Sequence, residues 1–228
     1  MTRQNLIIDA DDTLWENNIY FLQAFDEFVD FLDHSRLSPS EVRAVLDEIE
    51  DVNRHIHGYG SLNFGRNMQQ CYERLCEREI RSEDLEAIMR LATRIMEQPV
   101  EVIDGVPETL EYLAGRHDLT LFTKGHPEEQ KLKIERSGLG AYFSHAAIVQ
   151  EKNTSAYRAL AAERGFQPEV TWMIGNSPRS DINPALEAGL NAVFIPHRDT
   201  WVLEREPLRE GPGRLIQAGS FRDLREIF

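Results

Sequence analysis

The feature that most constrains the fold of this chain is residues 6–14, with the sequence LIIDADDTL. The first three residues are apolar and have the length and composition of a short buried strand. The stretch then becomes acidic at once, with Asp9, Asp11 and Asp12 inside four positions. Carboxylates this close raise one another's pKa unless a cation neutralises them. We therefore predict a hard divalent cation with oxygen ligands, Mg²⁺ above all, at the end of this strand.

The overall charge excludes some classes of partner. The chain has 228 residues and a formal net charge of −14, with acidic residues spread along it. Nucleic acids and anionic membranes require a basic face, so we expect neither as a partner. A small phosphorylated metabolite remains compatible, because a few local cations suffice to bind it. We find no secretory signal, no apolar run near the roughly 20 residues of a membrane span, and no metal-type neighbours for Cys71 and Cys76, so we expect a cytoplasmic protein.

Residues 15–99 show helical periodicity and almost no strand signal. Four amphipathic stretches predict helices: one over residues 19–32, one that starts at 38–41 and continues through Ile49, one over 63–78, and one from 82 through 95. The second has a capping signal, Ser-Pro-Ser-Glu, at its start. Four helices of this length predict a small all-α bundle.

From residue 100 the pattern changes to alternating strands and helices. We predict strands over 118–123, 146–149, 170–174 and 192–195, separated by helices over 127–137, 154–164 and about 182–188, with a further helix starting at 105–107. A possible edge strand near residue 215 and a short helix over 221–228 follow. Such alternation predicts a parallel sheet, with residues 6–8 as a central strand. The predicted fold is therefore α/β, a Rossmann-like core of residues 1–14 and 100–228, with residues 15–99 inserted as an all-α helical bundle.

Two carboxylates in the acidic stretch have the residue types of a nucleophile and an acid. Asp9 can attack phosphorus and form an aspartyl-phosphate, provided that Mg²⁺ bridges the two anions. Asp11 lies two residues on and can protonate a leaving oxygen and then deprotonate water. Thr13 can orient these carboxylates by hydrogen bonding. We assign Asp12 to the turn rather than to the chemistry.

Polar residues also follow three later strands of the predicted sheet. Thr123 ends a strand, and its hydroxyl, next to free backbone N–H groups, suits a phosphate oxygen. Lys124 and Gly125 come directly after it and lie close to the same phosphate position. Lys152 follows the next strand and can offset the charge of Asp9 and phosphate. The segment 175–181, GNSPRSD, follows a further strand and supplies oxygen ligands for Mg²⁺.

The combined pattern is more specific than any of its parts. The order is D-x-D-x-T-L after the first strand, then a threonine, then a lysine, then G-N-S-x-x-x-D, each after a strand. This pattern resembles the haloacid dehalogenase-like hydrolase superfamily over essentially the whole chain, including a helical cap inserted after the first motif. The resemblance implies that Asp9 is the nucleophile and a Mg²⁺ ligand. It implies that Asp11 is the general acid/base and binds the metal through its carbonyl, that Thr123 binds phosphate, and that Lys152 is the motif lysine.

The last motif departs from the usual pattern of that superfamily. The resemblance makes Asn176 and Asp181 the Mg²⁺ ligands of this loop, but an aspartate is common where this chain has Asn176. The amide keeps an oxygen donor and removes one negative charge. We therefore expect Asp181 to dominate metal binding from this loop, with Asn176 secondary and Mg²⁺ affinity weaker than with two aspartates. Asp12 also replaces a common glycine, which changes little.

The inserted bundle is expected to cover the substrate, because closure over the site expels water. Arg66 is the predicted contact for a phosphate or carboxylate group, since its planar fork matches both. His57 and Tyr59 are further candidates. The alternative for all three is that they only shape a turn between helices. An exposed cap helix could also pair two chains, so we leave monomer and homodimer open.

The resulting functional prediction is a Mg²⁺-dependent phosphatase for a small phosphomonoester. Two alternatives share the fold: a sugar phosphomutase, and a 2-haloacid dehalogenase, which needs neither Asp11 nor a metal loop at Asp181. A phospho-acceptor signalling domain also combines paired acids with a threonine and a lysine. Its aspartate would follow a middle strand, however, and it has no helical insert. A catalytically silent phosphometabolite-binding protein is the remaining alternative.

Overall fold

The computed structural model describes residues 2–228, which form two compact units. The first contains the residues up to Asn18 together with Val100–Phe228, and the second contains Ile19–Pro99. Residues 15–18 group with the first unit, although the sequence pattern assigns them to the helical insert. The reason is local pairing: Trp15 bridges to Val102 on the returning chain, and the carbonyl of Leu14 accepts a hydrogen bond from the N–H of Ile103.

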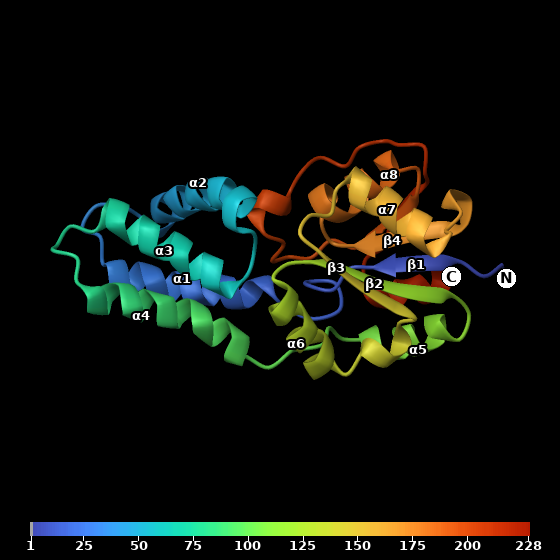
Figure 1. The fold of residues 1–228 in the computed structure, drawn as a ribbon, viewed down its shortest axis with the longest axis horizontal. Coiled ribbons are helices and arrows are strands. Elements are labelled where there is room, and N and C mark those ends of the chain that lie inside the picture. The colour runs from blue at the N-terminus through green and yellow to red at the C-terminus, as the bar shows by residue number, and fades with distance from the viewer. Residues whose placement is uncertain (1) are drawn as a thin grey trace. The chain divides into compact units, whose positions relative to one another are not determined.

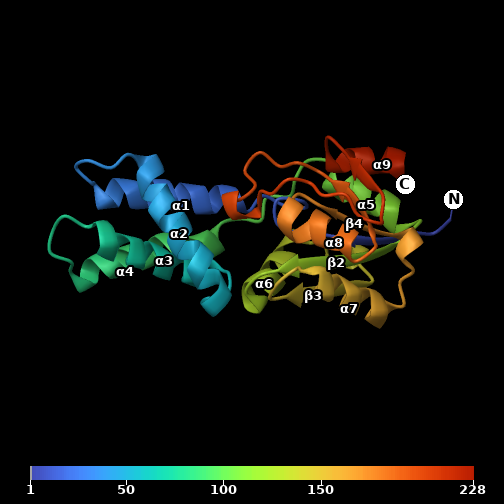
Figure 2. The ribbon, with the colours of Figure 1, turned by 90° about the horizontal axis from the view of Figure 1, so that it is seen from above.

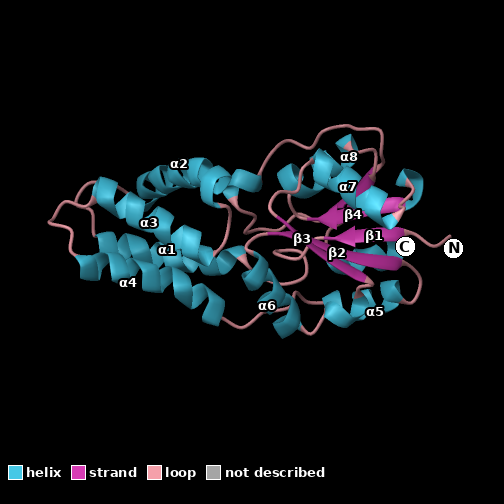
Figure 3. Ribbon diagram, viewed as in Figure 1, coloured by secondary structure: helices cyan, strands magenta, loops and turns pink. Residues whose placement is uncertain are grey.

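The first unit is built on a six-stranded sheet in which all pairings are parallel (Figures 1 and 3). The strand order is β3-β2-β1-β4-β5-β6, so the N-terminal strand is central, as predicted. The α/β fold class predicted from the sequence is thus confirmed. The strands are β1 (Asn5–Ile8), β2 (Asp118–Lys124), β3 (His145–Val149), β4 (Thr171–Gly175), β5 (Asn191–Phe194) and β6 (Leu215–Gln217).

Helices cover both faces of this sheet (Figures 1 and 2). Alternate residues of β1 point to opposite faces, which is the period of an extended strand. Leu6 and Ile8 pack in one apolar cluster with Leu110 and Leu224, whereas Ile7 packs in another with Tyr157. The helices are α5 (Val106–Ala114), α6 (Pro127–Ser137), α7 (Thr154–Arg164), α8 (Asn183–Glu187) and α9 (Leu224–Ile227).

The second unit consists of four helices around an apolar core of their own. They are α1 (Asn18–Leu32), α2 (Pro39–His57), α3 (Ser61–Leu75) and α4 (Ser82–Thr93). Ser38 caps α2 in the predicted capping box with Glu41. Gly65 allows α3 and α4 to pack closely, because a Cβ there would lie 2.6 Å from the sulfur of Met89. The third helix ends at Leu75 rather than at residue 78, since Cys76 adopts extended backbone angles.

The helix predicted near 182–188 differs from the expectation at its start. A π-helical turn, Pro178–Ile182, comes first, and α8 then occupies Asn183–Glu187. Pro184 lacks an N–H, which favours a change of hydrogen-bonding pattern at this point. No helix among residues 2–228 combines the length and apolarity that crossing a membrane would require.

Candidate active site

The strand ends bring the predicted site residues to one edge of the sheet. The strands are parallel, so their carboxyl ends lie along the same edge, which is where open α/β sheets bind ligands. Asp9 follows β1 directly, and its N–H donates to the carbonyl of Ile174 in β4. Thr123 lies near the end of β2, Lys152 follows β3, and Asn176 follows β4.

Lys152 lies at the centre of this edge and joins two predicted carboxylates. Its Nζ is 2.5 Å from Oδ1 of Asp9 and 2.5 Å from Oδ1 of Asp181, and it also donates to the carbonyl of Phe122 at 3.2 Å. All three charged side chains are buried, with Asp181 completely inaccessible. The structure therefore brings together Asp9, Lys152 and Asp181, which are separated by up to 172 positions (181 − 9) in the sequence.

Burial and mutual charge shift the pKa values of Asp9 and Lys152 in this cluster. The pKa of Asp9 is raised to about 7, first by burial and then by the charge of Asp181, while Lys152 acts in the opposite direction. Burial disfavours the charged form of Lys152, but the two carboxylates raise its pKa above the ordinary value. A single ammonium therefore faces two carboxylates, and a divalent cation would favour both of them in ionised form. Their donor atoms are oxygens, as Mg²⁺ prefers, so the residues fit this ion.

Thr13 and Asn176 complete the polar lining beside Asp9. The hydroxyl of Thr13 lies 3.2 Å from Oδ2 of Asp9 and 3.3 Å from Oδ1 of Asn176. The amide group of Asn176 donates to the hydroxyl of Thr200 at 3.1 Å. This bond turns the amide nitrogen away from Asp9, and the hydrogen-bond network places the amide oxygen on the side of Thr13 and Asp9. Asn176 can thus offer an oxygen to a cation held by the two aspartates.

The side chain of Asp11 is directed toward α6. Its carboxylate accepts hydrogen bonds from Nζ of Lys133 at 2.6 and 2.7 Å, from the amide of Gln130 at 2.8 Å, and from the indole of Trp15 at 2.7 Å. Gln130 and Lys133 lie three residues apart on α6, so they share one face of that helix. The neighbouring Asp12 has a φ of 59°, so the chain turns sharply here. That turn, rather than the two-residue spacing, decides the direction of Asp11.

The segment after β2 differs from the expected phosphate cradle. Thr123 is buried, and its hydroxyl lies 3.5 Å from the carbonyl of Lys124. The N–H of Gly125 donates to the carbonyl of Val149 at 3.2 Å, so it is not the free donor that the sequence suggests. The ammonium of Lys124 lies 2.5 Å from Oε1 of Glu204. Lys124 is therefore held by a protein carboxylate in this structure, and a role in phosphate binding stays a prediction.

Arg66 lies on α3 of the second unit, and its guanidinium donates to the side chain of Asn63 at 2.8 Å. Asn63 in turn donates to the carbonyls of His57 at 2.5 Å and Tyr59 at 3.3 Å. These bonds join the turn between α2 and α3 to the first residues of α3. Contact between Arg66, His57 or Tyr59 and a substrate stays a prediction.

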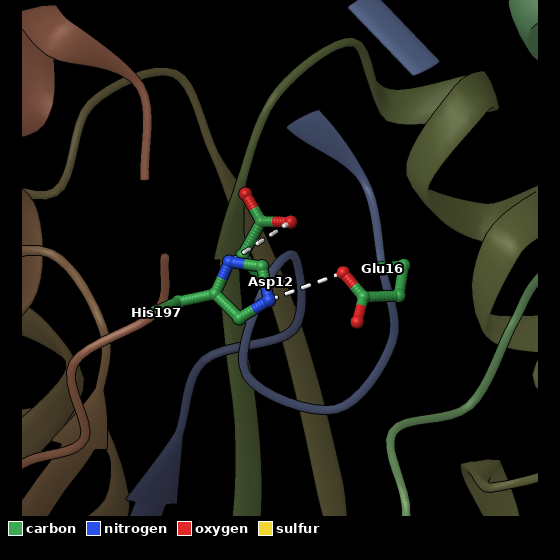
Figure 4. Close-up of side chains that lie close together, drawn as sticks. All are labelled: Asp12, Glu16 and His197. Carbon is green, nitrogen blue, oxygen red and sulfur yellow. Dashed lines mark ion pairs between the residues drawn. The ribbon is translucent and has the colours of Figure 1, made fainter. Parts of the chain in front are cut away.

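Three residues that the motifs did not select as site residues form a further titratable cluster, Asp12, Glu16 and His197 (Figure 4). Nε2 of His197 is 3.1 Å from Oε2 of Glu16, and its Nδ1 is 3.9 Å from Oδ1 of Asp12 and accepts from the N–H of Asp199. One ligand atom from each of the three residues lies within 4.8 Å of the others, which a metal would require. Oδ1 of Asp12, however, also accepts from the N–H groups of residues 17 and 18. These contacts fix the segment that leads into α1.

Sequence reasoning missed two residues that contact predicted site residues, Lys133 and Glu204, and also His197, which contacts Asp12 in the neighbouring turn. Lys133 has a detectable signal, because its spacing from Gln130 places both on one face of α6. Glu204 and His197 lie in the irregular segment between β5 and β6, where no periodicity marks a residue as buried. Only the fold brings them to the sheet edge.

Comparison with known proteins agrees with this geometry. A family model described as haloacid dehalogenase-like hydrolase matches residues 4–189. The crystal structure of a haloacid dehalogenase-like family hydrolase from Xanthomonas campestris is similar at a TM-score of 0.85 and 31% identity, covering 99% of this chain and 90% of that chain.

Two curated relatives match shorter stretches. A phosphoserine phosphatase from Thermus thermophilus is 30% identical over 115 residues, which are 48% of this chain and 43% of the relative. The pyrimidine 5'-nucleotidase PynA from Streptococcus pneumoniae is 32% identical over 108 residues, which are 44% of this chain and 46% of the relative. Each match thus spans less than half of the curated relative's length.

Proposed function

This chain belongs to the haloacid dehalogenase-like hydrolase family, and from that membership we propose that it is a Mg²⁺-dependent phosphatase for a small phosphomonoester. The observation that carries the proposal is the buried cluster in which Lys152 joins Asp9 and Asp181 at the end of the central strand. Both curated relatives are named for the removal of phosphate from small metabolites, which supports the same class of reaction.

The proposed ligands of Mg²⁺ are the carboxylates of Asp9 and Asp181, the amide oxygen of Asn176, and the backbone carbonyl of Asp11. When bound, the ion offsets the repulsion between the Asp9 carboxylate and the phosphoryl oxygens. Lys152 contributes a second positive charge at the same point, because its ammonium already contacts both carboxylates.

In the first step, an oxygen of Asp9 attacks phosphorus, the bond between phosphorus and the ester oxygen breaks, and Asp11 donates a proton to the leaving alkoxide. In the second step, Asp11 takes a proton from water, the water oxygen attacks phosphorus, and the bond to Asp9 breaks to release phosphate. The Thr123 hydroxyl is proposed to bind a phosphate oxygen. Asp11 contacts Lys133 in this structure, so the first step requires its carboxyl group to be protonated and turned toward the ester.

Asp11 and Asp181 are the features that disfavour the dehalogenase alternative. A dehalogenase of this fold also uses an aspartate nucleophile but needs neither an acid two residues later nor a metal carboxylate. A phosphomutase differs only in returning the phosphate to the substrate, so analysis of the products separates it. Arg66, His57 and Tyr59 remain proposed contacts for the rest of the substrate, whereas Lys124, expected near the phosphate, is held by Glu204. A screen across sugar phosphates, nucleoside monophosphates, phosphoglycolate and amino-acid phosphates would identify it.

The nucleophile is the direct test of this function. We expect Asp9→Asn to lower kcat by about 10³-fold or more, because the amide cannot form the covalent intermediate. Treating the wild-type protein with a chelator should suppress turnover, and added Mg²⁺ should restore it. The measurement is release of inorganic phosphate, with circular dichroism as a control that Asp9→Asn stays folded. Full activity of the variant, or of the chelated wild type, would contradict the proposal.

A further inference from the structure

A buried ring of polar contacts lies beside the proposed metal site. The ammonium of Lys124 contacts Oε1 of Glu204 at 2.5 Å and the hydroxyl of Ser180 at 2.8 Å. The other carboxylate oxygen of Glu204 accepts from the hydroxyl of Ser177 at 2.6 Å. The N–H of Ser180 closes the ring by donating to the same Ser177 hydroxyl at 2.9 Å. The ring therefore ties the end of β2 and the segment after β5 to the turn that follows β4.

Removing the charge of either Lys124 or Glu204 would leave the other charge buried without its partner. Glu204 is 7% exposed and the two serines are 6% and 3% exposed, so water is nearly excluded. Burial by itself would raise the pKa of Glu204, but Lys124 and the serine hydroxyls hold it below its ordinary value. Removing one partner of such a pair leaves an uncompensated buried charge, which is a large penalty. The pair is thus a stable constraint on the two serines.

Those serines belong to the turn that carries Asp181. The backbone N–H of Ser177 donates to Oδ2 of Asp181 at 2.9 Å, while its side chain binds Glu204. The other oxygen of Asp181 contacts Lys152. Ser180 immediately precedes Asp181 and is held by Lys124. The direction of the Asp181 carboxylate therefore depends on a turn fixed on both sides by the Lys124–Glu204 pair.

We infer that Glu204, paired with Lys124, is a positioning residue for the metal site, and that it fixes the Ser177–Asp181 turn so that Asp181 can bind a divalent cation together with Asp9. The inference rests on the proposed function and deepens it. It gives Lys124 a different role from the one expected from the sequence: Lys124 orders a metal ligand through Ser180 and Glu204. Groups in this outer layer around metal ligands typically change metal affinity by about 10–100-fold when removed.

The test is Mg²⁺ binding measured by isothermal titration calorimetry on chelator-treated, folded protein without substrate. We expect Glu204→Gln, which keeps the shape and removes the charge, to weaken Mg²⁺ binding by about tenfold or more. At saturating Mg²⁺, the KM for p-nitrophenyl phosphate should stay close to the wild-type value. The matched control is Glu187→Gln. It changes the same residue type at the end of α8, where the carboxylate pairs with Arg209 and Thr154 and the side chain is 45% exposed. Mg²⁺ affinity of this control should match wild type.

A second variant keeps the test decisive if Glu204→Gln does not fold. Ser177→Ala removes the hydroxyl that donates to Glu204 and accepts from the N–H of Ser180. It keeps the backbone N–H that donates to Asp181, and it should also weaken Mg²⁺ binding. Wild-type affinity in the folded Glu204→Gln protein, or in Ser177→Ala when the former does not fold, overturns the inference. An equal loss in Glu187→Gln overturns it too. Asp181→Asn is the reference. If wild type binds no Mg²⁺, or binds it equally without the Asp181 carboxylate, the proposed metal-dependent function fails, and the inference fails with it.

Discussion

At the scale of single residues, Lys133 determines how Asp11 is held. Its ammonium contacts both carboxylate oxygens of Asp11 and also the side-chain oxygen of Asn17. Together with Gln130 and Trp15, it holds the Asp11 carboxylate in one position beside α6, from which the side chain turns toward the ester in the proposed first step. This turn thus starts from one defined position, and small misplacements of a catalytic acid cost up to about 10²-fold in rate.

We predict that Lys133→Met lowers kcat by about tenfold and changes KM little, since it disturbs the orientation of Asp11 and removes no proposed substrate contact. The control is Lys131→Met on the same helix, where the lysine pairs with Glu128 and is 64% exposed. Steady-state kinetics on both variants measures the effect. Equal kcat values for wild type and Lys133→Met would contradict an orienting role.

In the side chain of Asn176, the NH₂ group has a defined partner as well as the oxygen. Its NH₂ group donates to the hydroxyl of Thr200, and that hydroxyl already donates its hydrogen to the carbonyl of His197 at 2.9 Å. A carboxylate at this position would face an oxygen that has no hydrogen to offer. This explains in physical terms why asparagine suits a position where an aspartate is common in the family.

We therefore predict that Asn176→Asp destabilises the protein without metal by about 1–3 kcal/mol, the cost of an unsatisfied buried polar group. Added Mg²⁺ should raise the Tm of the variant more than that of wild type, because the new charge lies at the metal site. Asn183→Asp, another buried asparagine bound to Pro207 and Arg209, is the control, and it should lose stability without extra rescue by Mg²⁺. Identical Mg²⁺-induced shifts in both variants would contradict this account.

At the scale of elements, the end of β4 is the most tightly constrained. Gly175 is its last residue, and a Cβ there would lie 2.3 Å from Oδ2 of Asp181 and 2.5 Å from its Cγ. The strand end and the following turn thus pack together only because position 175 has no side chain. Asp181 is completely buried, and its two carboxylate oxygens accept from Lys152 and from the N–H of Ser177, so its side chain cannot shift without breaking these bonds.

We predict that Gly175→Ala costs about 1–3 kcal/mol of stability, as overpacking in a filled interior does, and weakens Mg²⁺ binding by displacing Asp181. The control is Gly115→Ala after α5, where a Cβ would meet nothing nearer than two carbonyl oxygens at 3.8 Å. That variant should stay within about 0.5 kcal/mol of wild type. Urea unfolding and calorimetry with Mg²⁺ measure both effects. A Gly175→Ala protein with wild-type stability and Mg²⁺ affinity would show that the turn can move.

At the scale of the whole molecule, the two units have separate apolar cores, and His117 is buried beside the core of the first unit, directly before β2. Nδ1 of His117 accepts from the N–H of Gln4 at 3.2 Å, and its ring meets that of Phe228 edge-on at 5.8 Å. Burial lowers the pKa of His117 below its ordinary value. The folded protein therefore binds a proton at this site less readily than the unfolded chain.

Because the unfolded chain takes up this proton at about pH 6.5, stability should be full above that value and fall as the pH decreases through it. We predict that His117→Asn, which cannot titrate there, has a flatter dependence of Tm on pH than wild type between pH 7.5 and about 5.5. His55→Asn, at an exposed position of α2, should keep the wild-type slope. Thermal unfolding across this range is the measurement, and parallel curves for wild type and His117→Asn would contradict the assignment.

Much of the fold could be predicted because its signals are local. The helices over 127–137 and 154–164 have the predicted bounds, and the predicted strand positions differ from the observed ones by one residue. Deviations occur where the backbone leaves regular geometry, as at Pro184 and Cys76. The motif residues also allow the location of the site to be predicted, because parallel strands end at a common edge of the sheet.

By itself, the sequence determined the order and type of the elements, the central place of β1, and the meeting of strand ends at an acidic edge, because periodicity and motif spacing are properties of neighbouring residues. Only the tertiary structure decided which groups face each other there: that Asp11 is held by Lys133, that Lys124 pairs with Glu204, and that the N–H of Gly125 already has an acceptor. The direction of a side chain after a turn, and its partner from a distant irregular segment, depend on packing among residues up to 122 positions apart. No local pattern records that packing.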